Sequence, residues 1–277
     1  DEHGLKELGK DRWEKELKHL NSQADVVLRV NTLKTNVQQL QNALRDQEID
    51  TEPISGLENA LVLKERANVF TTEQFKDGWF EVQDASSQQV AHLLNPKSGM
   101  RVVDACAGAG GKSLHIATLM ENKGQIIAMD LYENKLNELK RRARRNGIHN
   151  LETRVIDSSK AIKKLIGKAD KVLIDAPCTG LGVLKRNPDT KWKLQPEFLE
   201  EIKKTQQEIL QSYSKMVKEE GELVYATCSI LPSENHLQVK EFLSSENGKS
   251  FTLVKEETIF PSESGFDGFY MALLKKK

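Results

Sequence analysis

The stretch MRVVDACAGAGGKSLHIATLMENKGQIIAMD, residues 100–130, decides the fold class. Its apolar run at 100–107 predicts a buried strand, because Val and Ile suit the pleated surface of a sheet. A glycine-rich turn follows, and residues 112–122 then predict a helix. A second apolar strand at 125–130 completes a strand–helix–strand unit, in which the two strands run parallel.

The same alternation continues toward the C-terminus. Strands are predicted at 152–157, 171–178 and 222–229, and helices at 133–147 and near 197–220. Short Val-, Ile- and Leu-rich runs between helices are typical of a doubly wound, mostly parallel α/β sheet with helices on both faces. Two strands at 250–256 and 268–276 have no helix between them, so we expect an antiparallel hairpin at one edge.

The N-terminal part has a different pattern. Residues 1–20 predict one helix, and Asn36 suits the N-cap of an amphipathic helix at 36–47. Short strands are predicted at 25–33, 60–65 and 79–84. We therefore expect a small α+β domain, similar to ferredoxin-like or RNA-recognition folds, over residues 1–84 and a larger α/β domain over 85–277.

Charge is balanced over the whole chain but not along it. The 277 residues carry 41 Lys and Arg and 41 Asp and Glu. Residues 1–95 carry 11 basic and 17 acidic side chains, whereas residues 96–277 carry 30 and 24. This asymmetry either arises by chance or indicates a C-terminal part that faces a polyanion. Four cations near the end of the predicted helix 133–147 either complement the helix dipole or contact phosphate: Arg141, Arg142, Arg144 and Arg145.

Three cysteines, Cys106, Cys178 and Cys228, lie far apart and form no C-x-x-C pair. We therefore expect no metal site and no disulfide framework. Free thiols fit a reducing compartment, so we expect a cytoplasmic protein. A monomer is a separate expectation. No apolar run approaches the roughly 20 residues that span a bilayer. The charged first residues contain no signal-peptide core, and a start at Asp1 instead of Met is expected of a piece of a longer protein.

Acidic side chains gather at the predicted strand ends, where parallel sheets bind ligands. An aspartate in this place often only caps a helix or closes a turn. Four in equivalent places are harder to explain in that way, and together they predict a binding site. The four are Asp104, Asp130, Asp157 and Asp175.

The glycine-rich turn fits neither common nucleotide-binding motif. A P-loop requires glycine where Cys106 stands, and a dinucleotide-binding motif starting at Gly108 requires glycine where Ser113 stands. The turn therefore either only joins strand to helix or lets an anionic group approach backbone N–H groups at a helix N-terminus. Asp130, about 20 residues farther on, can accept hydrogen bonds from ribose hydroxyls. Asp157 is placed to reach an adenine amino group, so a nucleoside-bearing ligand is predicted.

Two strand ends each deliver a thiol. Cys178 in DAPCTG stands where related loops carry an aromatic residue that stacks on a base, and Cys228 ends the next strand in ATCS. The alternative for each is an inert buried cysteine. A thiol becomes a useful thiolate beside a cation or a hydrogen-bond donor. Lys185 and Arg186 are candidates for that cation, unless they lie in a solvated loop.

Taken together, these motifs resemble the Sun/RsmB-type S-adenosylmethionine-dependent RNA (cytosine-5)-methyltransferases. Each motif alone is weak, but a Pro-Cys and a Thr-Cys-Ser motif at this separation are specific. The resemblance is carried by LRVNTLKT (28–35), QDASSQQVAHLLNPKSGMRVVDACAGAGGKS (83–113), DAPCTGLGVLKRNPDTKW (175–192), ATCSILPSEN (226–235) and DGFYMALLKK (267–276).

The resemblance implies a class I methyltransferase domain with a Rossmann-like sheet, S-adenosyl-L-methionine as cofactor and RNA as partner. It implies that Cys228 is the nucleophile, that Cys178 assists product release, and that Asp175 borders both cofactor and base. The cofactor-binding residues that it implies are Cys106, Ala107, Gly108, Ala109, Gly110, Gly111, Lys112, Asp130, Asp157 and Asp175.

Two positions depart from the family pattern. Gly108–Ala109–Gly110 replaces an Ala-Pro pair, which loosens the turn, and Asp157–Ser158 leaves the adenine-side assignment open. The expected activity is methylation of cytosine C5 in structured RNA, through a covalent bond from cysteine to C6. We expect 16S ribosomal RNA as substrate, with tRNA as the alternative. A small-molecule methyltransferase is disfavoured by LRVNTLKT and both cysteine motifs, and a non-catalytic RNA-binding relative is expected to have lost Cys228 or Asp175.

Overall fold

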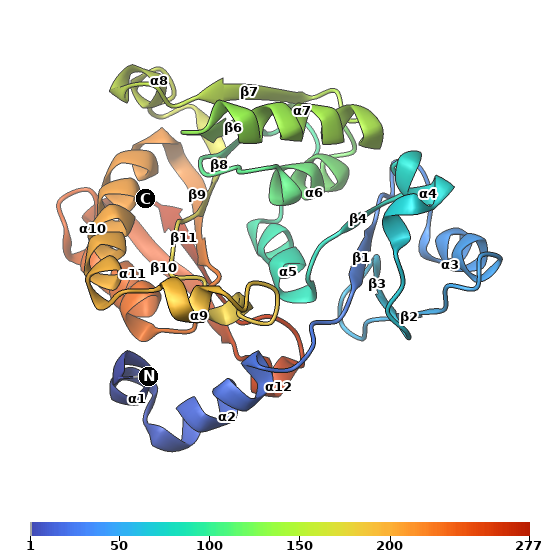
Figure 1. Ribbon diagram of the computed structural model, residues 1–277. Coiled ribbons are helices and arrows are strands. Elements are labelled where there is room, and N and C mark those ends of the chain that lie inside the picture. The colour runs from blue at the N-terminus through green and yellow to red at the C-terminus, as the bar shows by residue number, and fades with distance from the viewer. Residues whose placement is uncertain (1) are drawn as a thin grey trace.

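Five parallel strands form most of a seven-stranded sheet in the computed structural model, which describes residues 2–277 (Figure 1). The strand order is β10-β11-β9-β8-β5-β6-β7, and β10 and β11 are antiparallel to their neighbours. The strands are β5 (Arg101–Asp104), β6 (Gln125–Asp130), β7 (Leu151–Val155), β8 (Ala169–Asp175), β9 (Val217–Thr227), β10 (Phe251–Ile259) and β11 (Phe269–Lys276). The predicted parallel sheet with an antiparallel edge hairpin is confirmed.

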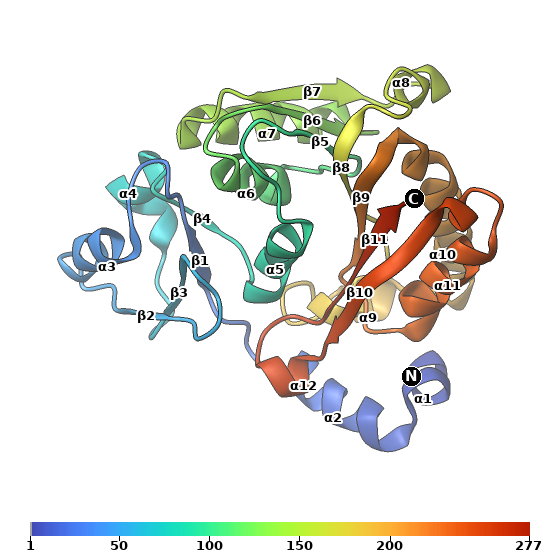
Figure 2. The same cartoon turned by 180° about the vertical axis from the view of Figure 1, so that it is seen from behind.

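Helices cover both faces of this sheet (Figures 1 and 2). Successive strand residues point to opposite faces, so Val102 packs with residues of α5 and α6, whereas Val103 packs with residues of α10 and α11. The helices are α5 (Ala85–Leu94), α6 (Gly111–Leu119), α7 (Glu133–Asn146), α8 (Ser159–Lys163), α9 (Thr190–Lys193), α10 (Pro196–Tyr213), α11 (His236–Ser244) and α12 (Pro261–Ser264).

A smaller antiparallel sheet with the order β2-β3-β1-β4 forms the N-terminal α+β unit. Its core contains Leu28, Leu40, Leu61 and Phe80, all fully buried. Asn36 caps α3 as predicted, since its side chain accepts the N–H of Gln39 at 2.9 Å. The elements are β1 (Val27–Val30), α3 (Val37–Arg45), β2 (Thr51–Pro53), β3 (Ala60–Leu63), α4 (Glu73–Lys76) and β4 (Phe80–Val82).

The single helix predicted over the first 20 residues is wrong, because the described part forms two helices, α1 (Glu2–Leu8) and α2 (Lys10–Leu20). Gly9 separates them with φ 77°, a conformation that glycine adopts without a steric cost. The break lets α1 fold back, so that Gly4 lies against the indole of Trp13. A Cβ on Gly4 would lie 2.3 Å from that ring.

The α1–α2 pair packs against the large sheet domain and not only against its own sequence neighbours. Trp13 shares a buried cluster with Leu184 and Ile230. Ser262, in α12, donates its backbone N–H to the buried Glu16 at 2.9 Å. Residues near the start of the chain thus support the loops that follow β8 and β9.

Two further expectations about elements are corrected. The helix expected near 197–220 ends at Tyr213, because Val217 is buried and pairs with Ala169 as the first residue of β9. Strand β2 was not predicted. It has three residues, reads as a polar stretch and ends at Pro53, which an edge strand tolerates.

Candidate active site

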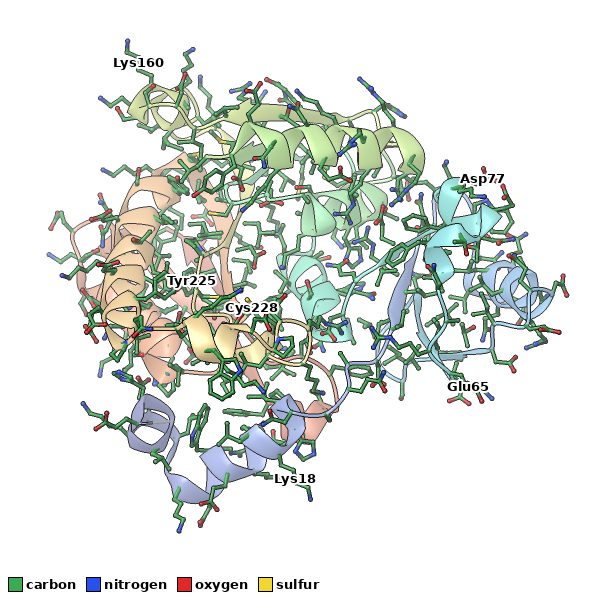
Figure 3. The ribbon with its side chains drawn as sticks, in the orientation of Figure 1. Lys18, Glu65, Asp77, Lys160, Tyr225 and Cys228 are labelled. Carbon is green, nitrogen blue, oxygen red and sulfur yellow. The ribbon has the colours of Figure 1, made fainter. Side chains whose placement is uncertain are left out.

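Two thiols meet at the carboxyl ends of adjacent parallel strands. The Sγ atoms of Cys178 and Cys228 are 3.3 Å apart, and both residues are half-buried free cysteines. They meet because β8 and β9 are neighbours with Asp175 opposite Ala226, which confirms that DAPC and ATCS lie side by side. Figure 3 labels Cys228 and Tyr225, which lie close together in the chain at the end of β9.

Lys112, in the first turn of α6, supplies a cation to this site. Its Nζ lies 2.7 Å from Oδ2 of Asp175 and 4.8 Å from the ring centre of Phe269. Burial by itself lowers the pKa of Lys112, but the carboxylate of Asp175 outweighs it and raises that pKa above its ordinary value. The charge of Cys228 acts in the same direction.

The expectation that Lys185 or Arg186 serves the thiols is wrong. Arg186 bridges the buried carboxylates of Asp84, at 2.8 Å, and Asp267. Lys185 donates to the backbone carbonyl of Gly265 at 2.7 Å. Two buried acids need a compensating charge, and that need determines where the arginine lies.

The glycine-rich turn before α6 leaves room for a ligand. A Cβ placed on Gly108 or Gly111 would meet no heavy atom of the described chain within 4 Å. Gly110 is different: its φ is 88°, and a Cβ would lie 1.8 Å from Leu139. Helix α6 begins without a side-chain cap, so its first N–H groups face this turn, as an anionic group such as a carboxylate requires.

Asp130 is built into the same turn. Its Oδ2 accepts the N–H of Gly108 at 2.8 Å, and its Oδ1 accepts the N–H of Tyr132 at 2.9 Å. Each carboxylate oxygen keeps a further lone pair for a hydroxyl donor. Asp157 lies two residues beyond β7, is exposed, and accepts the hydroxyl of Ser158 at 3.0 Å. The structure therefore joins Asp130 to the turn and leaves Asp157 at its periphery.

The rest of the turn is held by backbone contacts. Ala107 donates its N–H to the carbonyl of Met129 at 2.8 Å, and the carbonyl of Ala109 accepts from Arg142 at 2.8 Å. Removal from water, followed by the charges of nearby carboxylates, raises the pKa of Cys106 well above its ordinary value. These surroundings do not favour the thiolate that a nucleophilic cysteine requires.

The basic end of α7 is largely used inside the protein. Arg142 and Arg145 both pair with Glu81 of β4, which is 3% exposed, and Arg141 pairs with Glu138 on its own helix. These contacts tie the small sheet to the large domain. Arg142 and Arg145 therefore serve an ion pair within the protein, which supports a structural role for them instead of phosphate contact. Arg144 is exposed to solvent.

Of two buried acids near the site, Glu234 was missed by sequence reasoning, and Asp104 was identified only as one of the strand-end acids. Glu234 is fully buried behind the thiols, although its loop position in LPSEN is typical of an exposed residue. Asp104 accepts the hydroxyl of Ser113 at 2.6 Å, and burial raises its pKa to about 7. The signal for Asp104 was its place at a strand end, whereas Glu234 had only its place within the ATCSILPSEN motif.

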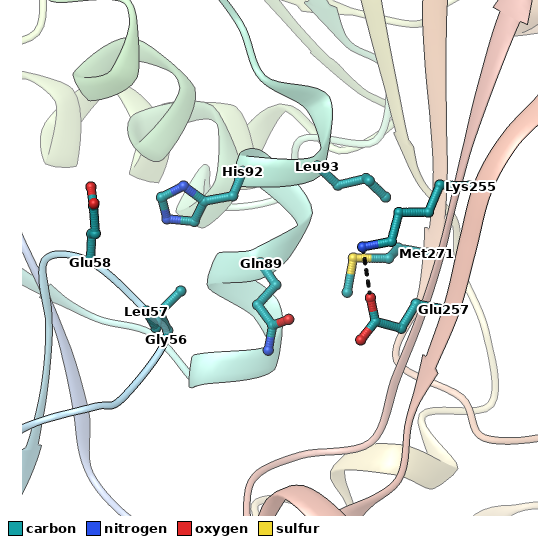
Figure 4. Close-up of a pocket in the computed structure, with 9 residues that line it drawn as sticks. All are labelled: Gly56, Leu57, Glu58, Gln89, His92, Leu93, Lys255, Glu257 and Met271. Atoms are coloured by element: carbon teal, nitrogen blue, oxygen red, sulfur yellow. Dashed lines mark ion pairs between the residues drawn. The ribbon is translucent and has the colours of Figure 1, made fainter.

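A cavity of about 350 Å³ opens beside the Cys178 loop. Its wall includes Thr179, Trp13 and the strongly exposed Trp192 of α9, together with leucines from both sides. A second cavity of about 360 Å³ lies between the 56–58 turn, α5 and β10. Figure 4 shows it with the Lys255–Glu257 ion pair. None of the predicted site residues lines this second cavity.

Among residues 2–277, no helix is both long and apolar enough to cross a bilayer. The same residues contain no cluster of three His, Cys, Asp or Glu side chains arranged to hold a metal ion.

Comparison with known proteins places these features in a family. The chain is 34% identical to the probable ribosomal RNA small subunit methyltransferase B of Synechocystis sp. over 284 residues, which cover 97% of this chain and 64% of that protein. It is 36% identical to ribosomal RNA small subunit methyltransferase B of Vibrio cholerae over 282 residues, which cover 99% and 64%. The chain thus spans less than two thirds of the length of these relatives.

A solved structure of a methyltransferase homolog from Pyrococcus horikoshii matches with a TM-score of 0.87 and 27% identity, covering 100% of this chain and 94% of that one. The family model for the ferredoxin-like domain of RsmF/B-like methyltransferases matches residues 3–70. The family model described as 16S rRNA methyltransferase RsmB/F matches residues 91–275, so the chain belongs to the RsmB/F methyltransferase family.

Proposed function

We propose that this chain transfers a methyl group from S-adenosyl-L-methionine to C5 of a cytosine in small-subunit ribosomal RNA. The observation that carries the proposal is the pair of thiols 3.3 Å apart, beside the Lys112–Asp175 ion pair. Membership of the RsmB/F family supports a ribosomal substrate. The relatives compared above are named as small-subunit rRNA methyltransferases.

S-adenosyl-L-methionine, when bound, supplies an electrophilic methyl group on a sulfonium. The open glycine turn and the uncapped start of α6 fit its carboxylate, and Asp130 fits its ribose. Asp157, at the periphery, is assigned to the adenine side. The residues proposed to hold the cofactor are Cys106, Ala107, Gly108, Ala109, Gly110, Gly111, Lys112, Asp130, Asp157 and Asp175.

In the first chemical step, the Cys228 thiolate adds to C6 of the cytosine. C5 is a weak nucleophile in the intact ring, and the new S–C6 bond makes it enamine-like, which is nucleophilic covalent catalysis. Lys112 balances the thiolate charge before attack. We propose that Asp175, with its carboxyl group protonated while the base is bound, donates a hydrogen bond to N3 and so stabilises the negative charge that develops on the ring; such acid groups typically contribute about 10²–10⁴-fold.

Product release requires removal of the C5 proton, after which the S–C6 bond breaks. Cys178 is proposed for this step because its sulfur lies next to that of Cys228. Its hydrogen bond to Cys228, together with burial and the charge of Cys228, raises the pKa of Cys178. Once the Cys228 sulfur is bonded to C6, the hydrogen bond and the charge are gone, so Cys178 ionises more readily.

The target base has to leave its stack to reach the thiols, so a loop or single-stranded site is favoured. The cavity beside Thr179 lies on the approach to the Cys178 loop. We propose that residues 1–84 form an RNA-binding accessory domain and that residues 85–277 form the catalytic domain. A tRNA substrate is the second candidate, since the thiol site serves either RNA equally.

The test uses a small-subunit rRNA transcript and a tRNA transcript, each with methyl-labelled cofactor. We expect the wild-type chain to label the rRNA at C5 of one cytosine, located by bisulfite sequencing. Cys228→Ala should reduce incorporation to background while the thermal unfolding curve stays cooperative. Full activity of Cys228→Ala, or methylation at a base other than cytosine, would contradict the proposal, and labelling of tRNA alone would select the second candidate.

A further inference from the structure

Glu234 lies behind the two thiols, at the end of the short turn Pro232–Glu234. Its side chain is fully buried. Oε1 accepts the N–H of Thr179 at 2.8 Å and the amide of Gln206 at 3.2 Å, while Oε2 accepts the hydroxyl of Thr179 at 2.6 Å and that of Ser229. A buried carboxylate is tolerated only with such a complete set of donors.

These donors come from both thiol loops. Thr179 directly follows Cys178, and Ser229 directly follows Cys228. Gln206, on α10, also donates to the carbonyl of Pro177 at 3.0 Å, on the other side of Cys178. One carboxylate therefore holds the chain on both sides of Cys178 and immediately after Cys228.

Glu234 is itself fixed to the sheet. Its backbone carbonyl accepts the hydroxyl of Tyr225 at 2.8 Å, and Tyr225 is fully buried in β9. The next residue, Asn235, donates to the carbonyl of Ser229 at 3.0 Å and accepts from Thr227 at 2.6 Å. The carboxylate thus has a defined place relative to the strand that carries Cys228.

We propose that Glu234 is a positioning residue that holds the Cys178 and Cys228 sulfurs at contact distance. The geometric part of this inference is independent of the proposed function, while its effect on catalysis rests on it. The charge of Glu234 has a second consequence. The pKa of Cys178 is raised first by its hydrogen bond to Cys228 and by burial, and the negative charge of Glu234 raises it further. The cation Lys112 instead interacts with the charge of Cys228.

Oxidised glutathione provides a chemical measure of the sulfur separation that does not require methyl transfer. One cysteine thiolate attacks the glutathione disulfide, forms a mixed disulfide and releases one glutathione thiolate. The second cysteine, as thiolate, then displaces the other glutathione and closes a Cys178–Cys228 disulfide. Two protein thiols are oxidised and one glutathione disulfide is reduced to two thiols. The closing step depends on how near the second sulfur is held.

The decisive variant is Glu234→Gln, which keeps the shape of the side chain. Its amide NH₂ group is a hydrogen-bond donor, so it cannot accept the hydroxyls of Thr179 and Ser229 as the carboxylate oxygen does. We expect the closing step to slow by about tenfold or more, as loss of one buried charge-assisted hydrogen bond predicts. On RNA we expect kcat to fall similarly while the KM for S-adenosyl-L-methionine is unchanged. Glu241→Gln, which removes an exposed carboxylate from α11, is the matched control. Peptide mass spectrometry locates the disulfide and excludes Cys106.

A folded Glu234→Gln protein that closes the disulfide at the wild-type rate would overturn the inference. If that variant does not fold, Thr179→Val and Thr179→Ser decide, since only serine keeps the hydroxyl donor. Slow disulfide closure in Thr179→Val together with near wild-type closure in Thr179→Ser supports the inference. Closure at the same rate in the two variants overturns it. A wild-type chain that closes the disulfide rapidly but methylates no RNA would refute the proposed function and leave the positioning role intact.

Discussion

The loops after β8 and β9 each present one thiol, but their surroundings differ in charge. Cys228 lies on the side of Lys112, whose ammonium is held by Asp175 over the Phe269 ring. The Cys178 loop is bonded through Thr179 to the buried carboxylate of Glu234. Two chemically identical side chains therefore meet a cation on one side and an anion on the other. In the proposed mechanism, this difference in neighbouring charge is what separates the nucleophile from the helper, because the two side chains are of the same type.

After the loss of activity expected of Cys228→Ala, the largest effect is expected from removing the thiol of Cys178. With Cys178→Ala, Cys228 still attacks C6, but the base for the C5 proton is missing, so a covalent RNA–protein adduct should accumulate. Turnover should fall by at least about 100-fold, in line with general base catalysis. Denaturing gel electrophoresis with labelled RNA detects the adduct. An adduct that accumulates in Cys228→Ala instead would reverse the two roles.

The next effect concerns Asp104, whose neighbours include Asp175, Lys112 and Cys106. Burial raises its pKa from 3.8 to about 7 in the folded protein. Its contribution to stability is therefore full below pH 3.8 and is lost as pH rises through about 7. Asp104→Asn should remove this loss, so that the variant gains stability relative to wild type, by a few kcal/mol, between about pH 4 and pH 8.

Urea unfolding across that pH range measures the difference. The asparagine side chain in this variant keeps an oxygen that accepts the hydroxyl of Ser113, so the core contact is retained. Parallel pH profiles for the two proteins would show that folding does not raise the pKa of Asp104, and would contradict this prediction.

A smaller effect is expected from the cation. Lys112→Gln should slow alkylation of Cys228 by iodoacetamide at neutral pH by about tenfold, because a nearby cation favours the thiolate. Alkylation of Cys178 should change less, and Lys112→Arg, which keeps the charge, should retain most of the rate. Mass spectrometry of the two cysteine peptides gives both rates. If alkylation of Cys178 and Cys228 slows equally in Lys112→Gln, the cation does not distinguish the two thiols, and the proposed difference in charge between the two loops is contradicted.

The smallest effect is expected at the cavity on the Cys178 side. Trp192 is 83% exposed and lies between Lys191 and Lys193, an arrangement typical of a stacking surface for unpaired bases. Trp192→Ala should raise the KM for RNA severalfold, equivalent to about 1 kcal/mol of lost stacking, without changing kcat. Trp192→Phe should keep most of the affinity. An unchanged KM in steady-state assays on the same transcript would exclude Trp192 from RNA contact.

Much of the fold was predictable from local pattern. The alternation of apolar strands and amphipathic helices predicted the parallel sheet. The expectation of no helix between the last two strands predicted the edge hairpin correctly, although the four-residue helix α12 does lie between them. The break at Gly9 and the early start of β9 were not predictable, because both depend on packing against distant residues. The bend at Gly9 lets Trp13 pack with the distant Leu184 and Ile230. Val217 leaves the helical pattern because it pairs with Ala169.

The candidate site divides in the same way. Strand ends and the glycine turn placed both thiols, Asp130 and Asp175 at one rim, because a parallel sheet brings its carboxyl ends together. The choice of Arg186 as the cation failed, since nothing local shows that Asp84 and Asp267 are buried beside it. Glu234 was missed for the same reason.

The sequence by itself determined the sheet, the rim and the residue types that gather there, since these follow from apolar periodicity and chain order. Only the tertiary structure decided which charge faces which thiol. Lys112 and Cys228 are 116 residues apart in the chain, and Glu234 reaches Thr179 across 55. Electrostatic influence acts through distance in space and through burial, and neither can be read from positions along the chain.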